Sequence, residues 1–216
     1  MTPPGLHLED LRVTLDGRCI VDLRVTIAPG EVLTVMAPSG AGKSTLLAAI
    51  TGTLDPAFRQ SGRILLDGRD LTPLPPQKRR VGLLFQDALL FPHLSVAGNL
   101  AFALPPHHRD RAARIAAALA ECGLPDLADR DPATLSGGER ARIALMRTLL
   151  AEPRALLLDE PFSRLDADLR RRTRDFVLQT ARARNLPTIL VTHDRDDAEA
   201  AGGGVISPRG ALLSAS

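Results

Sequence analysis

The sequence predicts an α/β fold with a parallel sheet, a short antiparallel region before it and a helical insertion in its middle. Short apolar runs alternate with helical patterns from residue 31 onward, which is typical of a parallel sheet. The first 27 residues instead alternate apolar and polar side chains on both sides of Asp16-Gly17, the pattern of a β-hairpin. From Ser95 to about Glu152 the pattern turns helical, with alanine-rich segments.

The elements follow in order along the chain. We expect hairpin strands at 6–15 and 19–27, a buried strand at 31–36, a helix at 44–52, a second hairpin-like region around 63–68 and a strand at 81–85. After the helical segment we expect a strand at 155–159, a helix at 166–184, a strand at 188–192, a short helix from Asp194 and a small hairpin around 208–210.

Composition excludes several classes of protein. The chain has 216 residues, of which 44% are hydrophobic and 24% charged, so we expect one globular domain and neither disorder nor a coiled coil. Its apolar runs are far shorter than the ~20 residues of a membrane-spanning helix, and its first residues do not resemble a signal peptide. Cys19 and Cys122 show no metal-binding spacing, which favours a reducing compartment. A net charge of +2 and the absence of Trp and Tyr argue against a nucleic-acid partner.

Residues 37–45 (APSGAGKST) lie between a predicted strand and a predicted helix, the position of a phosphate-binding loop. Small residues let successive backbone N–H groups turn toward one point at a helix N-terminus, where anions are favoured. Lys43 would add a positive charge at the β- and γ-phosphates of a nucleotide, and Ser44 would bind Mg²⁺. The predicted nucleotide-binding residues of this loop are Ala37, Pro38, Ser39, Gly40, Ala41, Gly42, Lys43, Ser44 and Thr45.

One position departs from the usual pattern. Ala37 stands where the pattern G-x-x-x-x-G-K-[ST] has its first glycine. Alanine is the mildest replacement, but it would strain the loop if this position needed a positive φ.

Residues 155–160 (ALLLDE) read as a buried strand that ends in two acids. Carboxylates at the C-terminal end of a buried parallel strand face the ligand crevice of the sheet. We expect Asp159 to hold Mg²⁺, and Glu160 to orient or deprotonate a water that attacks the γ-phosphate.

Residues 135–139 (LSGGE) open a helical run and offer a second anion-binding helix start. Because one phosphate loop already holds one triphosphate, this second site suggests that two copies enclose the nucleotide between Ser136, Gly137 and Gly138 of one chain and the phosphate loop of the other. The simpler interpretation is a capping box between Ser136 and Glu139, and the two are compatible.

At these residues the chain resembles the ATP-binding cassette (ABC) ATPases along essentially its whole length. LSGGE matches the family signature LSGGQ with Glu139 in place of glutamine, and residues 161–166 resemble the D-loop, which adds Asp166 to the nucleotide site. Gln86 matches the glutamine that reaches Mg²⁺ and the attacking water, and His193 matches the histidine that contacts the γ-phosphate. The resemblance implies a P-loop NTPase core, an N-terminal antiparallel β subdomain and an inserted helical subdomain at about 88–152 that carries the signature. It also implies ATP and Mg²⁺ as cofactors and a head-to-tail dimer.

Leu15 stands where many family members stack an aromatic ring on adenine. Leucine keeps the apolar contact with the base and loses the ring-specific part, so we expect weaker ATP binding and poorer discrimination between ATP and GTP.

The resemblance is strongest to the ATPases of bacterial importers, in particular those of the Ynj type, through FQDALLF, DPATLSGG and LLLDEPFSRLD. It implies a cytoplasmic chain on the inner face of the plasma membrane, an integral membrane permease as direct partner and a solute-binding protein as indirect partner. Phe91, Leu94 and Val96 are the expected apolar anchors for the permease, with core packing of the helical subdomain as the equal alternative. The competing functions are the ATPase of an export or lipoprotein-release system and an ABC switch ATPase that acts on no membrane partner.

Overall fold

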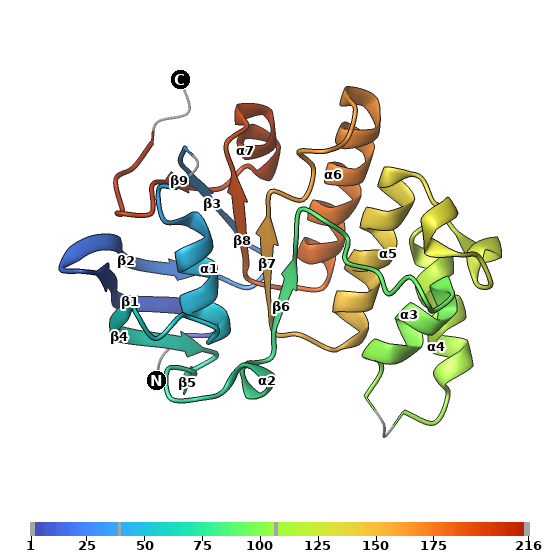
Figure 1. Cartoon of the computed structure of the whole chain (residues 1–216), viewed down its shortest axis with the longest axis horizontal. Coiled ribbons are helices and arrows are strands. Elements are labelled where there is room, and N and C mark those ends of the chain that lie inside the picture. The colour runs from blue at the N-terminus through green and yellow to red at the C-terminus, as the bar shows by residue number, and fades with distance from the viewer. Residues whose placement is uncertain (1–2, 39, 106–107, 214–216) are drawn as a thin grey trace. The chain divides into compact units, whose positions relative to one another are not determined.

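The computed structural model describes residues 3–38, 40–105 and 108–213 (Figure 1). The chain divides into two compact units. The first comprises the chain up to Leu83, Arg154–Glu160 and the chain from Leu178 on; the second comprises Leu84–Pro153 and Pro161–Val177. The described part of the chain contains no helix long and apolar enough to cross a membrane.

The first unit contains two sheets. The antiparallel sheet has the order β2-β1-β4-β5, made from β1 (Leu6–Leu15), β2 (Arg18–Ile27), β4 (Arg59–Leu66) and β5 (Arg69–Asp70). The second sheet has the order β6-β7-β8-β3-β9, made from β6 (Val81–Leu84), β7 (Ala155–Asp159), β8 (Thr188–Thr192), β3 (Val32–Met36) and β9 (Val205–Ile206). β3 pairs in parallel with β8 and β9, and β7 pairs in parallel with β8. The predicted α/β fold with a parallel sheet and an N-terminal antiparallel region is thus confirmed.

Helix α1 (Lys43–Thr51) links the two sheets of this unit. Its Leu46 and Ile50 are fully buried in a core that also contains Leu11 and Val13 of β1 and Leu157 of β7. The helix therefore has little freedom, and its first turn is held at the carboxyl end of β3.

The far end of α1 is held by a buried arginine that no motif indicates. Arg79, the last residue of the short helix α2 (Pro76–Arg79), donates to the carbonyls of Ala49 and Ile50 at 2.8 and 2.9 Å. A side chain at Gly52 would lie 2.6 Å from this guanidinium. The end of α1 is therefore closed by a charged cap, and glycine is required beside it.

The C-terminal segment differs in detail from the expected hairpin. Val205 and Ile206 add to β3 as a parallel edge strand, and an antiparallel bridge between Ile206 and Leu212 closes the turn that follows. The first unit also contains α7 (Arg195–Ala201), which Asp194 caps by accepting from the backbone of Asp196 and Asp197.

The second unit is helical. It contains α3 (Val96–Ala103), α4 (Arg111–Glu121), α5 (Gly137–Leu150) and two 3-10 turns, Pro125–Leu127 and Pro132–Thr134. Helix α6 (Ala167–Ala183) begins in this unit and ends in the first. Fully buried Val96 and Leu100 of α3 and Ile143 and Leu145 of α5 belong to the core of these helices.

Candidate phosphate-binding and hydrolysis site

The predicted phosphate loop connects the end of β3 to the first residue of α1, as a phosphate loop requires. Gly40 and Gly42 adopt left-handed backbone conformations, with φ of 78° and 98°. At Gly42 a Cβ atom would also meet the backbone oxygen of Ile20 at 2.9 Å, so both conformation and packing require glycine there. Ser39 lies outside the described residues.

Ala37 has no left-handed conformation, so the alanine in place of the pattern's first glycine causes no backbone strain. The Ala37 side chain is buried, and its carbonyl oxygen accepts a hydrogen bond of 2.6 Å from Nζ of Lys43. This carbonyl positions the lysine, a role that any residue at position 37 can fill.

Lys43 is the centre of a charged cluster in the first unit. Only 7% of its side chain is exposed, and its Nζ lies 3.1 Å from Oε1 of Glu160. The other carboxylate oxygen of Glu160, Oε2, lies 3.1 Å from Nδ1 of His193. Three predicted residues that are far apart in the sequence therefore meet at one point.

The strand order explains this meeting. Because β7 and β3 both pair in parallel with β8, the carboxyl ends of all three strands lie at the same edge of the sheet. Glu160 directly follows β7 and has a φ of 46°, while its N–H donates to the Val191 carbonyl at 2.9 Å. His193 directly follows β8.

Asp159, the last residue of β7, and Glu160, which follows it, have pKa values shifted in opposite directions. Burial raises the pKa of Glu160, but the hydrogen bonds and charges of Lys43 and His193 outweigh it and hold this pKa below its ordinary value. Burial, followed by the charge of Glu160, raises the pKa of Asp159. Glu160 is therefore ionised beside Lys43.

The donors available for Mg²⁺ in this unit are oxygen atoms. Ser44 presents an exposed hydroxyl on the first turn of α1, and Asp159 a half-buried carboxylate. Mg²⁺ prefers such ligands and completes its shell with water and phosphate oxygens, so these side chains fit the ion. Within the described residues, no group of three or more His, Cys, Asp or Glu forms an all-protein metal site.

The surroundings of the loop include one feature that no motif predicts. A hollow beside the loop is lined by Pro38 and Ala41, by His193 and by the C-terminal residues Ser207 and Pro208. The segment after β9 therefore reaches the same surface as the phosphate loop.

Two further residues predicted to bind nucleotide lie in the first unit. Thr45 is half-buried in α1. Leu15 is also half-buried and ends β1, opposite Arg18 in the sheet register.

The signature residues lie in the second unit and start α5. The Ser136 side chain accepts from the Glu139 N–H at 3.3 Å, and the Glu139 carboxylate accepts from the Ser136 N–H at 2.8 Å. This capping box confirms the structural interpretation of the motif, and its bonds lower the pKa of Glu139.

The two signature glycines also have a packing role. A Cβ on Gly137 would lie 2.9 Å from Leu165, and one on Gly138 would lie 2.5 Å from Leu169. Asp166 caps α6, because its side chain accepts from the Leu169 N–H at 3.0 Å. Gln86 is exposed just beyond β6. These predicted residues therefore belong to the second unit together.

The segment after Gln86 corrects one prediction. Val96 is 0% exposed in the core of the second unit, so it is not a surface anchor, and the core alternative holds for it. Phe91 and Leu94 are half-buried. Phe102, which the sequence did not single out, is 70% exposed and packs edge-on against the Phe91 ring, with 4.7 Å between centroids.

Asn99 was also missed. It is fully buried, accepts from the Phe91 N–H at 2.7 Å and donates to the carbonyls of Phe91, Leu94 and Ser95 at 3.0–3.3 Å. The sequence carried one signal for it, because asparagine is unusual in so apolar a helix as VAGNLAFA.

The chain is similar to known ABC transporter proteins. Residues 20–163 match the family model described as ABC transporter. The chain is 46% identical over 187 residues to YnjD of Escherichia coli, described as an uncharacterised ABC transporter ATP-binding protein, with 86% of each chain covered. It is 45% identical over 202 residues to PhnT of Salmonella typhi, a putative 2-aminoethylphosphonate import ATP-binding protein. The aligned region covers 90% of this chain but 53% of PhnT. The chain thus spans about half the length of that relative.

A solved structure is also similar. CbiO1 of Clostridium perfringens, described as part of the ABC transporter complex cbiONQ, superposes with a TM-score of 0.84 at 29% identity, covering 98% of this chain and 88% of CbiO1.

The packing of the signature helix generates a prediction. Replacing Gly138 with alanine places a methyl group against Leu169, and we expect the free energy of unfolding to fall by about 1–3 kcal/mol, as for other overpacked sites. Urea unfolding of Gly138→Ala, Leu169→Ala and the double variant measures the coupling. The double variant should lose less than the sum of the two single losses; a Gly138→Ala protein as stable as the parent would contradict the close packing.

Proposed function

This chain belongs to the ABC transporter family, and we propose that it is the ATP-hydrolysing subunit of a bacterial importer. It would bind and hydrolyse MgATP as a head-to-tail dimer and drive solute import through a separate membrane permease. The observation that carries the proposal is the cluster of Lys43, Glu160 and His193 at the start of α1.

The cluster fits a triphosphate. Lys43 is already oriented by the Ala37 carbonyl, and the start of α1 adds the favourable end of the helix dipole. An entering γ-phosphate would compete with Glu160 for the ammonium group of Lys43. Glu160 would then be available to accept a proton from the attacking water, while His193 contacts the γ-phosphate.

Mg²⁺ would be held by Ser44, Asp159 and Gln86, with Gln86 assigned from the family motif. The ion supplies neutralisation of charge on the β- and γ-phosphates. Asp159 contributes a carboxylate whose burial strengthens its attraction for a cation, while Ser44 contributes a neutral hydroxyl next to Lys43.

The second copy would complete each nucleotide site. Ser136, Gly137 and Gly138 of one chain would meet the triphosphate held by the phosphate loop of the other, and Asp166 would take part from the D-loop. The capping box supports this role, because the carboxylate of Glu139 is engaged by the Ser136 backbone instead of facing an incoming anion.

The permease would dock on the apolar surface of the second unit. We define this permease surface by Phe91 and Leu94, together with the exposed Phe102 and Leu89. Its partner would be an apolar cytoplasmic segment of the permease, which places this chain on the cytoplasmic face of the inner membrane. A solute-binding protein would act on the same permease, and these other chains would select the solute.

Import is favoured over export or a role without a membrane partner by the names of the relatives. PhnT and the FbpC protein of Rhizobium meliloti, which is 43% identical over 182 residues, are both described as import ATP-binding proteins.

The dimer generates the first prediction. Glu160→Gln keeps the shape of the side chain and removes the base, so we expect a protein that binds MgATP without hydrolysing it and accumulates as a closed dimer. Light scattering with and without saturating MgATP measures the mass. Lys43→Ala in the same background is the control and should stay monomeric. A Glu160→Gln protein that remains monomeric with MgATP would count against the sandwich dimer.

Leu15 generates the second prediction. Leu15→Tyr restores a ring for adenine to stack on, and we expect ATP to bind about five-fold more tightly, with better discrimination against GTP. Equilibrium titration with a fluorescent ATP analogue, competed by ATP and by GTP, gives both values. Leu15→Met, which changes the side chain without adding a ring, should not alter them. An unchanged ATP dissociation constant for Leu15→Tyr would show that Leu15 lies outside the adenine site.

A further inference from the structure

Two arginines from different elements contact the three residues that follow Gln86. Arg147 of α5 donates to the carbonyls of Ala88 and Leu89 at 3.2 and 2.9 Å. Arg164, in the segment before α6, forms an ion pair with Asp87. All of these residues belong to the second unit.

The Arg147 contacts fix the backbone of Ala88 and Leu89 against α5. Its guanidinium also lies 5.3 Å from the centre of the Phe91 ring and donates to the Asn99 side chain at 3.3 Å. The Leu89 backbone has a left-handed φ of 45°, which leucine adopts only when its surroundings impose it. Residues 88 and 89 are therefore immobilised relative to α5, and the remaining freedom of the segment lies at Gln86 and Asp87.

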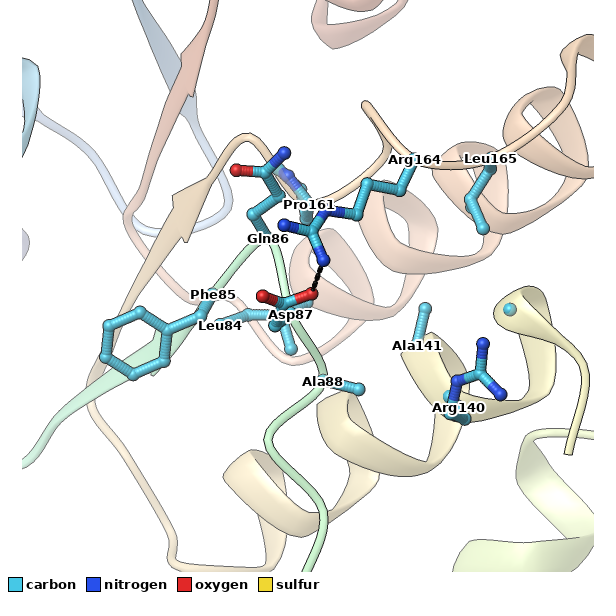
Figure 2. Close-up of a pocket in the computed structure, with 11 residues that line it drawn as sticks. Leu84, Phe85, Gln86, Asp87, Ala88, Arg140, Ala141, Pro161, Arg164 and Leu165 are labelled. Atoms are coloured by element: carbon cyan, nitrogen blue, oxygen red, sulfur yellow. Dashed lines mark hydrogen bonds and ion pairs between the residues drawn. The ribbon is translucent and has the colours of Figure 1, made fainter. Parts of the chain in front are cut away.

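The Arg164–Asp87 pair is of a different kind. Its side chains are 62% and 53% exposed, and an ion pair in such surroundings contributes little to folding stability. Its position is the informative property, because Asp87 directly follows Gln86 and Arg164 lies two residues before Asp166. In Figure 2 the Arg164 side chain extends from the D-loop segment to the Asp87 carboxylate, beside Gln86.

Asp87 and Arg164 also line the same pocket. Gln86 and Asp87 form part of its wall, Pro161, Arg164 and Leu165 form another part, and Gly137 and Arg140 at the start of α5 complete it. The segment after Gln86, the D-loop and the signature helix therefore meet around this hollow, and the Arg164–Asp87 ion pair links the first two.

We propose that the Arg164–Asp87 ion pair is a positioning pair that makes the Gln86 segment follow the D-loop. When a second copy engages Asp166, movement of the D-loop would be transmitted through Arg164 to Asp87 and so to Gln86, the residue that the family motif assigns to Mg²⁺. This inference rests on the proposed nucleotide-sandwich dimer and adds to it the coupling between dimer closure and Gln86. Neither residue of the pair touches nucleotide; both act through Gln86.

The test uses the Glu160→Gln protein, so that hydrolysis does not interfere, and reverses the charges. We compare Asp87→Arg, Arg164→Asp and the double variant, and measure by light scattering the MgATP concentration at which half of the protein is dimeric. Each single variant should raise this concentration about two- to five-fold, the range for an exposed ion pair. The double variant restores the pair with its polarity reversed. Its MgATP concentration at half dimerisation should return to that of the parent, the Glu160→Gln protein.

Three controls separate this role from a general effect on the fold. Charge reversal at the Glu9–Arg63 pair of the first unit, whose side chains are 37% and 63% exposed with 2.6 Å between their atoms, should leave the dimerisation midpoint unchanged. Binding of a fluorescent ATP analogue to the monomer should be the same in all variants. The difference between the single variants and the parent should shrink as the salt concentration rises, because the interaction is exposed.

The outcomes distinguish the two proposals. A parent that stays monomeric at saturating MgATP contradicts the sandwich dimer itself. A parent that dimerises, with single variants at the same midpoint or a double variant no better than the worse single variant, overturns the role of the ion pair. If a charge reversal unfolds the protein, Asp87→Asn and Arg164→Gln give the same comparison without opposing charges.

Discussion

The burial of a positively charged lysine is the constraint on which the rest of the site depends. Lys43 is buried at the start of α1, and a buried ammonium group is costly unless a carboxylate and a carbonyl compensate it. Glu160 and the carbonyl of Ala37 provide this compensation. In the proposed function these are the charges that an entering triphosphate would reorganise.

The parallel sheet makes this arrangement possible. Lys43, Glu160 and His193 follow three different strands, and the strand order β7-β8-β3 brings the carboxyl ends of these parallel strands to one edge of the sheet. α1 is fixed at both ends, by the glycines of the loop at its start and by the Arg79 cap at its finish. Rigidity of this kind holds a catalytic group to within the small tolerance that proton transfer needs.

Much of this could be predicted from the sequence, because the phosphate loop and the acidic strand are contiguous segments whose local patterns carry their chemistry. The capping box at Ser136 and the hairpin at Asp16-Gly17 were predictable for the same reason. Whether Ala37 strains its loop could not be predicted, because the strain depends on the backbone φ angle, which the structure provides and the sequence does not.

The remaining features depend on contacts between residues distant in sequence. Val96 was expected on the surface as one of two alternatives, and it is buried, because an apolar residue near a helix start has the same local pattern in a core and at an interface. Asn99 and Arg147 are 48 residues apart, and Asp87 and Arg164 are 77 residues apart. No spacing rule connects such pairs, so only the fold reveals them.

Co-purification is the most direct test of whether this chain drives a separate membrane permease. Tagged protein would be isolated from gently solubilised membranes of its native host, and the proteins that accompany it identified by mass spectrometry. We expect to recover a polytopic permease together with a solute-binding protein. Both should be reduced when Phe102, the most exposed residue of the permease surface, is changed to aspartate. Recovery of the chain only in the soluble fraction, with no membrane protein bound, would contradict this role, and a membrane partner without a binding protein would contradict import.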